Sequence, residues 1–443
     1  MNYTLETGLR GTLRHPRTML LVVLTLALGL ASVMTMLTLL SVLGADPLPG
    51  VSQRLHIAWA DSRPLARSGE SETYGDGTLV PPLWKLSDVR AMQQSRPDIR
   101  QVALVTAPVT VGNLDGSASK SVSAAMAIGP MLQVFNVPLR HGRFWTPDEE
   151  AARTPVVIIS RDLSQRLLGR EDGTGGEVRL GNHTFRVIGI SEHWAPRPRP
   201  HFLPSSDAGW RGAGDQVFVP AEAALASGIG ISSTRVCDDA GFGGFRFDQV
   251  NVEQCRWLVL WAELKDAAQQ QDYARSLQAF AAERHAAGIF PRQPATRLQT
   301  MAQWLHLNRV VPDSVRLNLW LAIGLLVLCL VNVAGLLAAR FLRRSGEYGV
   351  RRVLGAPRRA IVGACLVESI LAGLLGGLLA LPLTLAGLWL MRQQGEAYAP
   401  LARLSPSLFV LLLVLALITG MLVGLLPAIR AARQEPALQV KTL

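Results

Sequence analysis

Apolar residues in this sequence are gathered into long runs instead of being spread evenly along the chain. Four runs are each long enough to cross the hydrocarbon core of a bilayer as a helix. They extend over Met19–Leu43, Leu317–Ala339, Ile361–Met391 and Leu408–Ile429. A polar stretch of about 270 residues separates the first run from the second, and that length suffices for folded domains. The pattern predicts an α-helical membrane protein with four spans and a large domain inserted between the first two.

The distribution of basic residues predicts the orientation of these spans. The segment 340–360 carries seven arginines, and further basic residues flank the first and last runs. These flanking residues are Arg10, Arg14, Arg17, Arg430, Arg433 and Lys441. The loop between the third and fourth runs holds only Arg392 and Arg403. By the positive-inside rule, both termini and the arginine-rich loop are cytoplasmic and the large domain is outside.

Composition adds little to this interpretation. The chain of 443 residues is 49% hydrophobic, with a mean hydropathy of +0.25, as a membrane protein requires. Its net charge of +11 is mostly the topological signal, so it is poor evidence for nucleic-acid binding, which we do not expect. The first apolar run is too long for the core of a signal peptide, so we expect an uncleaved anchor. Before it, Leu5, Leu9 and Leu13 form a helical stripe that predicts an amphipathic helix on the inner leaflet.

The outer segment alternates between helical and strand patterns. "KLSDVRAMQQSRP" has helical character, and a mainly β pattern runs from Val122 to Trp194, interrupted by the helix "SRDLSQRLLG" with Ser160 as its N-cap. Loops dominate 196–248, after which "RWLVLWAEL" reads as a strand and "AAQQQDYARSLQAFAAERHAAG" as a helix. We therefore expect a split α+β unit formed from the two ends of the segment, with a β-rich insert at about 122–250.

Cysteine and histidine offer few candidate sites. Cys237 and Cys255 lie in the outer domain, where an oxidising compartment permits a disulfide, but sequence alone leaves their proximity open. Cys329 and Cys365 fall in apolar runs, where small core residues are expected. The eight histidines are scattered without ligand spacing, so no metal site is expected. Trp257, Trp261 and Trp304 are expected to pack in the core of the outer domain.

Two of the polar residues within the apolar runs suggest specific contacts. Glu368, near the inner end of the third run, is costly there unless it is paired, and we expect a polar contact with the arginine-rich loop, for example with Arg358 or Arg359, rather than a proton relay. Asn332 in the second run is expected to form an interhelical hydrogen bond.

The arginine-rich loop carries the most specific pattern. Its arginines come in pairs, at 343–344, 351–352 and 358–359, and Glu347 stands four residues before Arg351 at helical ion-pair spacing. Topology and contact with anionic lipid could account for the charge alone. They do not account for the small apolar knuckle at 353–356. A short cytoplasmic helix that ends at Gly355 would present this knuckle to a partner protein.

Several stretches together resemble the MacB/FtsX-type ABC permease family. The segment "NVAGLLAARFLRRSGEYGVRRVLGAPRRAIVGACLVESILAGLLGGLLA" and the closing "LPAIRAARQEPALQV" resemble its membrane signature. The outer stretches "FNVPLRHGRFWTPDE", "TPVVIISRDLSQRLLG" and "FRVIGI" are similar to the MacB-type periplasmic core domain. Most of the chain is covered, and the combination is more specific than any one motif.

The resemblance implies a type VII, mechanotransmission permease of the bacterial inner membrane. In that family the loop between the second and third spans holds a coupling helix that docks on the nucleotide-binding subunit. The implied docking residues are Arg343, Arg344, Glu347, Arg351, Arg352, Gly355, Arg358 and Arg359. The outer domain would correspond to the Porter and Sabre subdomains. The implied function is export of peptides, antibiotics or other amphiphiles by a dimer of this chain with itself or with a paralogue. The permease would work either with a periplasmic adaptor and an outer-membrane channel or with its outer domain alone.

One departure from full-length MacB determines the expected partner. The sequence has no G-x-x-x-x-G-K-[ST] loop, and its glycine-rich stretch "LGREDGTGGEVRLG" lacks the lysine. We therefore expect no cofactor and no enzymatic activity in this chain, with ATP and Mg²⁺ bound by a separate ATPase subunit. An FtsX-like regulator of a cell-wall hydrolase and a lipoprotein-releasing permease remain alternatives.

These inferences give nine expected segments along the chain. They are an N-terminal helix (1–17), a first span (18–44), the periplasmic domain (45–312), a second span (313–340), the coupling loop (341–360), a third span (361–391), a short periplasmic loop (392–407), a fourth span (408–429) and a cytoplasmic tail (430–443).

Overall fold

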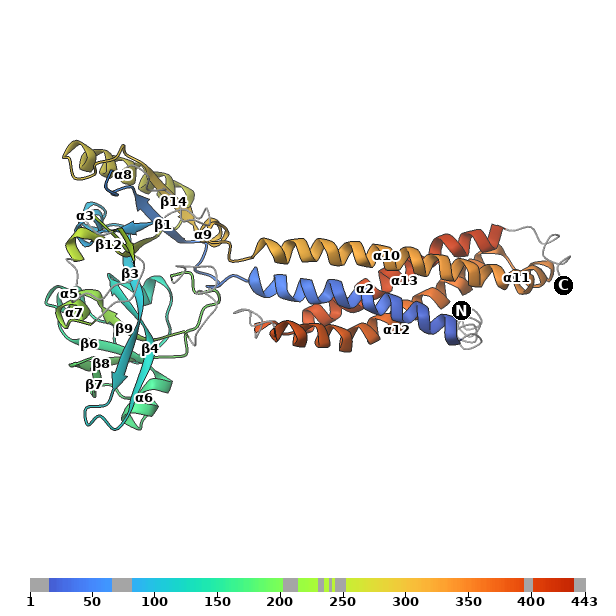
Figure 1. Cartoon of the computed structure of the whole chain (residues 1–443), viewed down its shortest axis with the longest axis horizontal. Helices are drawn as coiled ribbons and strands as arrows, with labels where there is room; N and C mark the ends of the chain where they lie inside the picture. The colour runs from blue at the N-terminus through green and yellow to red at the C-terminus, as the bar shows by residue number, and fades with distance from the viewer. Residues whose placement is uncertain are drawn as a thin grey trace. The chain divides into compact units, whose positions relative to one another are not determined.

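The chain divides into two compact units. The computed structural model describes residues 16–65, 82–201, 214–229, 235–238, 241–243, 252–393 and 401–433. One unit combines Met1–Gly44 with Val311–Leu443, and the other is Ala45–Val310 (Figure 1). All but the last two residues of the expected N-terminal helix, the middle of the 392–407 loop and most of the tail lie outside the described residues.

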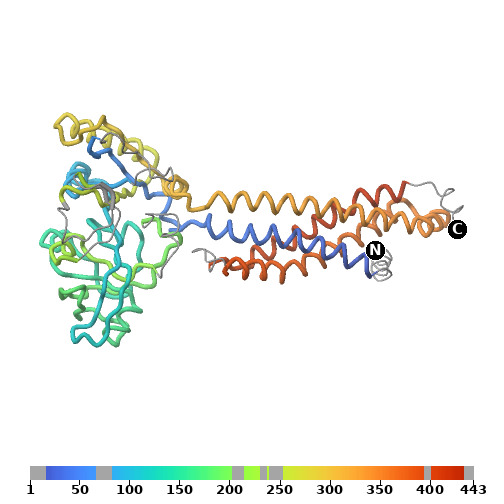
Figure 2. Tube along the Cα trace, in the orientation of Figure 1, coloured from blue at the N-terminus to red at the C-terminus, as the bar shows by residue number. Residues whose placement is uncertain are grey.

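The first unit is helical. Its elements are α2 (Pro16–Leu43), α10 (Asp313–Arg343), α11 (Ser345–Val353), α12 (Arg358–Arg392) and α13 (Pro406–Arg433). All but α11 are long and apolar enough to cross a membrane, which confirms the four predicted spans. Figure 2 shows the start of α2, the short α11 and the end of α13 at the same end of this unit. That arrangement agrees with the cytoplasmic side that the arginines predict for all three.

Small residues let the spanning helices approach closely. A Cβ atom added to Gly373 of α12 would lie 2.6 Å from the backbone oxygen of Ala416 in α13. A Cβ atom on Gly420 of α13 would lie 2.8 Å from the oxygen of Ser369. Close backbone contact of this kind is how helices pack in lipid, where apolar burial alone gives little preference. Asn332 differs from expectation, because it lies exposed on α10 and no hydrogen bond joins it to the described residues.

The second unit is built on one large sheet. Its 11 strands follow the order β14-β1-β13-β3-β4-β9-β6-β8-β5, with β2 paired to β13 and β7 paired to β3 and β8. A second sheet of three strands has the order β11-β10-β12. The bounds are β1 (Leu55–Ala60), β2 (Leu83–Trp84), β3 (Gln101–Gly112), β4 (Ser119–Ile128), β5 (Leu139–Gly142), β6 (Val156–Ser160), β7 (Glu177–Leu180), β8 (His183–Ser191), β9 (Asp215–Pro220), β10 (Arg235–Cys237), β11 (Gly241–Gly243), β12 (Cys255–Arg256), β13 (Leu258–Glu263) and β14 (Thr296–Thr300).

The two ends of this unit's sequence combine, as the split-domain hypothesis expects. Strand β1 pairs antiparallel with both β13 and β14, which come from the far end of the segment. The expected β-rich insert is not a separate sheet, however, because β4 pairs with β3 along ten residues and continues the same sheet. Figure 1 shows β1, β14 and α8 at one end of the unit and β6, β7, β8 and α6 at the other.

Strand β9 lies where the sequence predicts only loops. It pairs parallel with β4 and antiparallel with β6, so it joins the two ends of the sheet. Its apolar residues Val217, Phe218 and Val219 are fully buried.

Helices of the second unit cover the sheet and its edges. They are α3 (Leu86–Ser95), α4 (Met131–Val134), α5 (Pro147–Ala151), α6 (Arg161–Leu168), α7 (Ala221–Ala226), α8 (Ala267–Ala286) and α9 (Met301–Leu307). Ser160 caps α6 as predicted, since its hydroxyl accepts a hydrogen bond from the Leu163 amide. Trp257, Trp261 and Trp304 are all buried, as expected for core residues.

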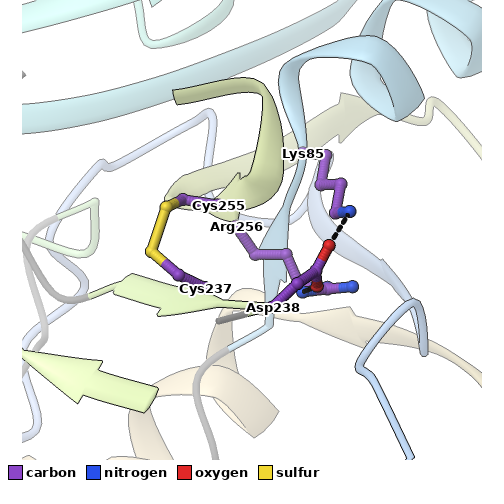
Figure 3. The surroundings of a disulfide bond; sticks show 5 residues. All are labelled: Lys85, Cys237, Asp238, Cys255 and Arg256. Carbon is purple, nitrogen blue, oxygen red and sulfur yellow. Dashed lines mark hydrogen bonds and ion pairs between the residues drawn. A yellow bond between two sulfur atoms is a disulfide. The ribbon is translucent and has the colours of Figure 1, made fainter. Parts of the chain in front are cut away.

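A disulfide joins Cys237 and Cys255 and closes the small sheet (Figure 3). The two residues face each other in the β10–β12 pairing, and both are buried. Asp238, next to Cys237, accepts hydrogen bonds from Lys85 Nζ at 2.6 Å and from Arg256 Nη1 at 2.7 Å. Burial opposes ionisation of Asp238, but these two cations lower its pKa below the ordinary value. The disulfide and this charged group together hold β10 and β12 against the start of α3.

Replacing both Cys237 and Cys255 by serine should destabilise the second unit. The cysteines are 18 residues apart, and a cross-link over a loop of that length contributes about 3 kcal/mol in the chain-entropy model. Thermal unfolding of the purified full chain should therefore begin several degrees lower, and a reductant should lower the wild type in the same way. Alkylation of both thiols in the native, unreduced wild type would contradict the assignment.

Candidate coupling segment

The segment between α10 and α12 forms a short helix with a defined end. Helix α11 stops at Val353 because Gly355 adopts a left-handed conformation, with φ of +94°, which is costly for other residues. The amides of Leu354, Gly355 and Ala356 complete the last turn by bonding back to carbonyls of α11. Pro357 then precedes α12, which begins at Arg358. The sequence prediction of a short helix that ends at Gly355 is thus confirmed.

The outer surface of α11 is apolar at its end and basic around it. Leu354 is 81% exposed and Val353 69% exposed, and Val350 is also exposed. Arg351 and Arg352 are half-buried beside them, and Arg358 and Arg359 are exposed at the start of α12. We call Val350, Val353 and Leu354 with these four arginines the knuckle surface. Apolar side chains this exposed, rimmed by cations, are typical of a surface that docks a partner.

The inner surface of α11 packs against the spanning helices of its own unit. Tyr348 is buried, its ring lies 5.7 Å from the guanidinium carbon of Arg344, and its hydroxyl oxygen lies 3.6 Å from Cys365 Sγ in α12. Arg344, where α10 passes into α11, is also buried. One face of α11 is therefore fixed to the spans and the other is exposed.

Glu368 of α12 is the centre of this attachment. Its side chain is 2% exposed, and its Oε1 lies 2.8 Å from Arg340 Nε while its Oε2 lies 3.1 Å from Arg344 Nη1. Arg344 Nη2 also lies 3.2 Å from Glu347 Oε2, which belongs to α11. Arg340 and Arg344 are four residues apart on α10 and so project from the same face. Two arginines and two glutamates thus tie α10, α11 and α12 together.

The predicted contact of Glu368 with the arginine-rich loop is confirmed at Arg344, but the two residues named as examples were wrong. Arg358 and Arg359 stand on the same helix as Glu368, about ten residues away, a separation of about 15 Å along the axis, beyond side-chain reach. Arg344 was predicted to face the partner subunit, but its guanidinium is directed inward to Glu368. The structure leaves Arg343, Glu347, Gly355, Arg358 and Arg359 exposed.

Arg340 was missed as a functional residue by the sequence analysis. A signal for it existed, because Arg340 and Arg344 are the basic residues at i, i+4 spacing where the second apolar run ends, and Glu368 is the acidic residue of the facing run. Within the part of the chain that the structure describes, no three histidine, cysteine or acidic side chains gather as a metal site would require.

Comparison with known proteins covers both units. The model of the MacB-like periplasmic core domain matches residues 19–280, and the model of the FtsX-like permease C-terminal region matches residues 320–436. The chain belongs to the MacB/FtsX family of ABC transporter permeases. Permeases of this family work with an ABC ATPase subunit. Four apolar helices and the periplasmic core domain make this MacB-type permease a multi-pass inner-membrane protein with its large domain in the periplasm.

Individual relatives are distant from this MacB-type permease. The macrolide export ATP-binding/permease protein MacB of Wolinella succinogenes is 24% identical over 431 residues, which cover 94% of this chain and 57% of that protein. The protein of the same name from Bdellovibrio bacteriovorus is 27% identical over 244 residues, covering 55% of this chain and 32% of that protein. The periplasmic region of MacB from Actinobacillus actinomycetemcomitans has a crystal structure that covers 58% of this chain and 92% of its own, at 12% identity and a TM-score of 0.35. The chain therefore spans less than two thirds of the length of either curated relative.

Substituting Glu368 by alanine in this MacB-type permease should destabilise the helical unit strongly. The change leaves Arg340 and Arg344 buried without their shared carboxylate, and breaking a buried pair in this way costs about 3–5 kcal/mol. Thermal unfolding of the full chain in nanodiscs measures the effect. Glu347→Gln is the matched control, since Glu347 pairs with the same Arg344 but its side chain is 42% exposed, and exposed pairs contribute about 0–1 kcal/mol. Equal unfolding temperatures for the two variants would show that the buried group contributes nothing.

Proposed function

We propose that this chain is the permease subunit of a mechanotransmission ABC exporter. A separate ATPase subunit, which holds ATP and Mg²⁺, docks on the knuckle surface. The spans relay its movement to the periplasmic domain, which drives export of peptides, antibiotics or other amphiphiles. The observation that carries this proposal is the two-sided character of α11, exposed on one face and fixed to the spans by buried charges on the other.

The knuckle surface suits a protein partner better than a lipid headgroup. Anionic lipid would attract the arginines, but it offers no place for Val353 and Leu354 at the cytoplasmic end of the unit. A protein groove with acidic side chains at its rim would cover these apolar residues and pair with the surrounding guanidinium groups. Arginine is suited to this role because its planar guanidinium can bind carboxylates with two hydrogen bonds.

The Glu368 group supplies the connection that the relay requires. Pulling α11 away from α10 or α12 would separate Arg344 from Glu368 and leave buried charges unpaired, which is strongly unfavourable. Movement of α11 therefore costs less free energy when α10 and α12 move with it. A push on the knuckle surface becomes a displacement of two spans, with no step in which the cargo enters the bilayer.

Four spans in one chain support a dimer, either with a second copy or with a paralogue. Asn332 lies exposed on α10, within a helix that crosses the membrane, and an amide in hydrocarbon is unfavourable without a hydrogen bond. A second subunit packed on this face of α10 would supply that partner. A periplasmic adaptor and an outer-membrane channel would complete the export route on the outer side.

The direction of transport is taken from relatives. The proteins from Wolinella succinogenes and Bdellovibrio bacteriovorus are both named macrolide export ATP-binding/permease proteins. Export by the present chain, with its ATP-binding part on another polypeptide, follows by analogy with them.

Reversing the charge of Arg351 and Arg352 to glutamate should abolish docking of the ATPase subunit. Like charges facing each other across an interface cost several kcal/mol, so binding should weaken by about a hundredfold or more. Copurification with the co-expressed ATPase and ATPase activity in nanodiscs measure the loss.

The matched control is Arg430→Glu together with Arg433→Glu. It removes the same charge at the same end of the helical unit, from exposed residues at the end of α13 that are outside the knuckle surface. This control should retain the complex and its activity. If the Arg351 and Arg352 reversal also retains both, the arginines serve topology and lipid contact only.

A further inference from the structure

The periplasmic unit contains a cleft that the relay mechanism does not use. It has a volume of about 730 Å³, within the usual size range of ligand sites. One wall is the end of α3 with the residues that follow it, and the other is α5 with the first turn of α7. The floor is formed where β3 begins and β4 ends, at Gln101 and Ile128.

The cleft is held open at a fixed width by contacts between its walls and floor. Arg90 of α3 donates a hydrogen bond from Nε to Glu222 Oε1 of α7 at 3.0 Å, which joins the two walls. The Gly129 amide, just after β4, donates to Glu150 Oε1 of α5 at 2.9 Å. Gly129 has a φ of +96°, and a Cβ atom there would lie 2.6 Å from the Gln101 oxygen, so the floor admits no larger residue. The cleft is thus built into the fold.

Its lining combines apolar surface with amide groups. The apolar part consists of Pro97, Ile99, Ile128, Pro130, Trp145 and Pro147, and the amide side chains are those of Gln93, Gln94, Gln101 and Gln133. Trp145 is buried, so its indole ring forms part of the inner wall. Such a surface fits an amphipathic molecule that has both an apolar body and hydrogen-bonding groups.

The charges in the lining are balanced except at one carboxyl group. Glu222 is paired with Arg90 and also lies 3.6 Å from Arg153 Nε. Arg100 lies 3.0 Å from Glu263 Oε2. Among the described residues, no arginine or lysine side chain forms an ion pair with Glu150. Its hydrogen-bond partner is instead a neutral donor, the Gly129 amide.

Glu150 therefore has the environment of a carboxylate that gains by meeting a cation. Burial raises its pKa and the nearby Glu222 carboxylate raises it further, whereas contacts with Gly129 and Trp145 and the charge of Arg90 oppose this rise without cancelling it. Arg90 lies close enough to act on Glu150 but is paired directly with Glu222, so an amine placed against Glu150 would supply the direct ion pair that the described residues do not provide. An anionic ligand, in contrast, would face two carboxylates and a single arginine that is already paired.

We propose that this cleft binds an amphipathic ligand that carries a cationic amine, with the amine at Glu150 and the apolar body against Trp145 and the prolines. The site lies in the periplasm, so the ligand comes from that compartment. Its role as exported cargo rests on the proposed function, but the binding itself does not depend on the ATPase.

The test compares probes that differ only in charge, using the full chain in nanodiscs without any ATPase subunit. The first pair is the tripeptide amide acetyl-Leu-Trp-Lys-NH₂ and its analogue acetylated on the lysine amine. The second pair is tryptamine and tryptophol, which lack peptide groups. Calorimetry or ligand-observed NMR measures affinity, and empty nanodiscs correct for partitioning into lipid.

The charged member of at least one pair should bind about tenfold more tightly than its neutral partner, the size expected for one charge-assisted hydrogen bond. Glu150→Gln should remove this preference, because glutamine keeps the acceptor for Gly129 but not the charge. Asp148→Asn is the matched control, with the same charge change on the exposed side of α5, and it should keep the preference. Preference within the tripeptide pair alone would identify peptides as the ligands, and preference in both pairs would identify amphiphilic amines in general.

The pH dependence provides a second readout that needs no variant. Because the pKa of Glu150 is raised, the carboxylate forms only above the ordinary range of glutamate, about 4.3. Affinity for the charged probe should therefore rise as the pH increases through that raised pKa, while affinity for the neutral probe stays level. Equal affinities within both pairs, or a preference that survives Glu150→Gln, would overturn the proposal. Either result would leave docking of the ATPase on the knuckle surface unaffected, so the two proposals fail separately.

Discussion

A carboxylate cannot remain charged among apolar helices unless positive groups surround it, and this constraint organises the cytoplasmic end of the helical unit. Glu368 meets the constraint with Arg340 on one oxygen and Arg344 on the other. Desolvating three charged groups is unfavourable, so the group is weak evidence for stability as such. The charged group contributes instead to the geometry of the helical unit. Arg340, Arg344 and Glu368 meet only when α10 has one particular rotation and α12 one particular register. The direction in which α11 leaves α10 follows from that register, since Arg344 stands at the junction.

The rest of the helical unit is compatible with transmitting a displacement from this point. Gly373 and Gly420 bring the backbones of α12 and α13 into contact. Because no flexible side chains separate the two helices there, a displacement of α12 is passed directly to α13. Gly376 of α12 similarly faces Leu26 of α2, with a Cβ atom there 3.0 Å from the leucine. Charge fixes α12 at its cytoplasmic end and close packing fixes it along its length. Both are needed if a force applied at α11 is to move spans instead of bending a loop.

Sequence patterns predicted the spans well, because the length of an apolar run is set by the thickness of the bilayer and needs no tertiary information. The end of α11 was predictable for a similar local reason, because Gly355 can adopt the left-handed conformation that ends a helix and Pro357, close behind it, favours the start of a new one. The partners of Glu368 were not predictable by proximity in sequence, because helical geometry separates it from Arg358 and brings it to Arg344 instead. Strand β9 was missed because its six residues resemble a short loop until β4 and β6 pair with it on both sides. Both predictions failed for the same reason. Each depends on a contact with a residue or strand that is distant along the chain, and the sequence alone does not identify that contact.

Glu368 and Glu150 show how the same side chain acquires opposite roles from its surroundings. Both are withdrawn from water, which by itself disfavours the ionised form. The fold gives Glu368 two guanidinium groups, so its charge is satisfied within the protein and its effect is to hold helices in place. It gives Glu150 one backbone amide as a hydrogen-bond donor, while the nearest arginine, Arg90, is paired with Glu222, and an open cleft lies beside the carboxylate. A fully buried acid whose counter-charges are built in serves the structure, whereas a partly buried one without a direct ion pair, at the wall of a cleft, is suited to meet a cation from outside.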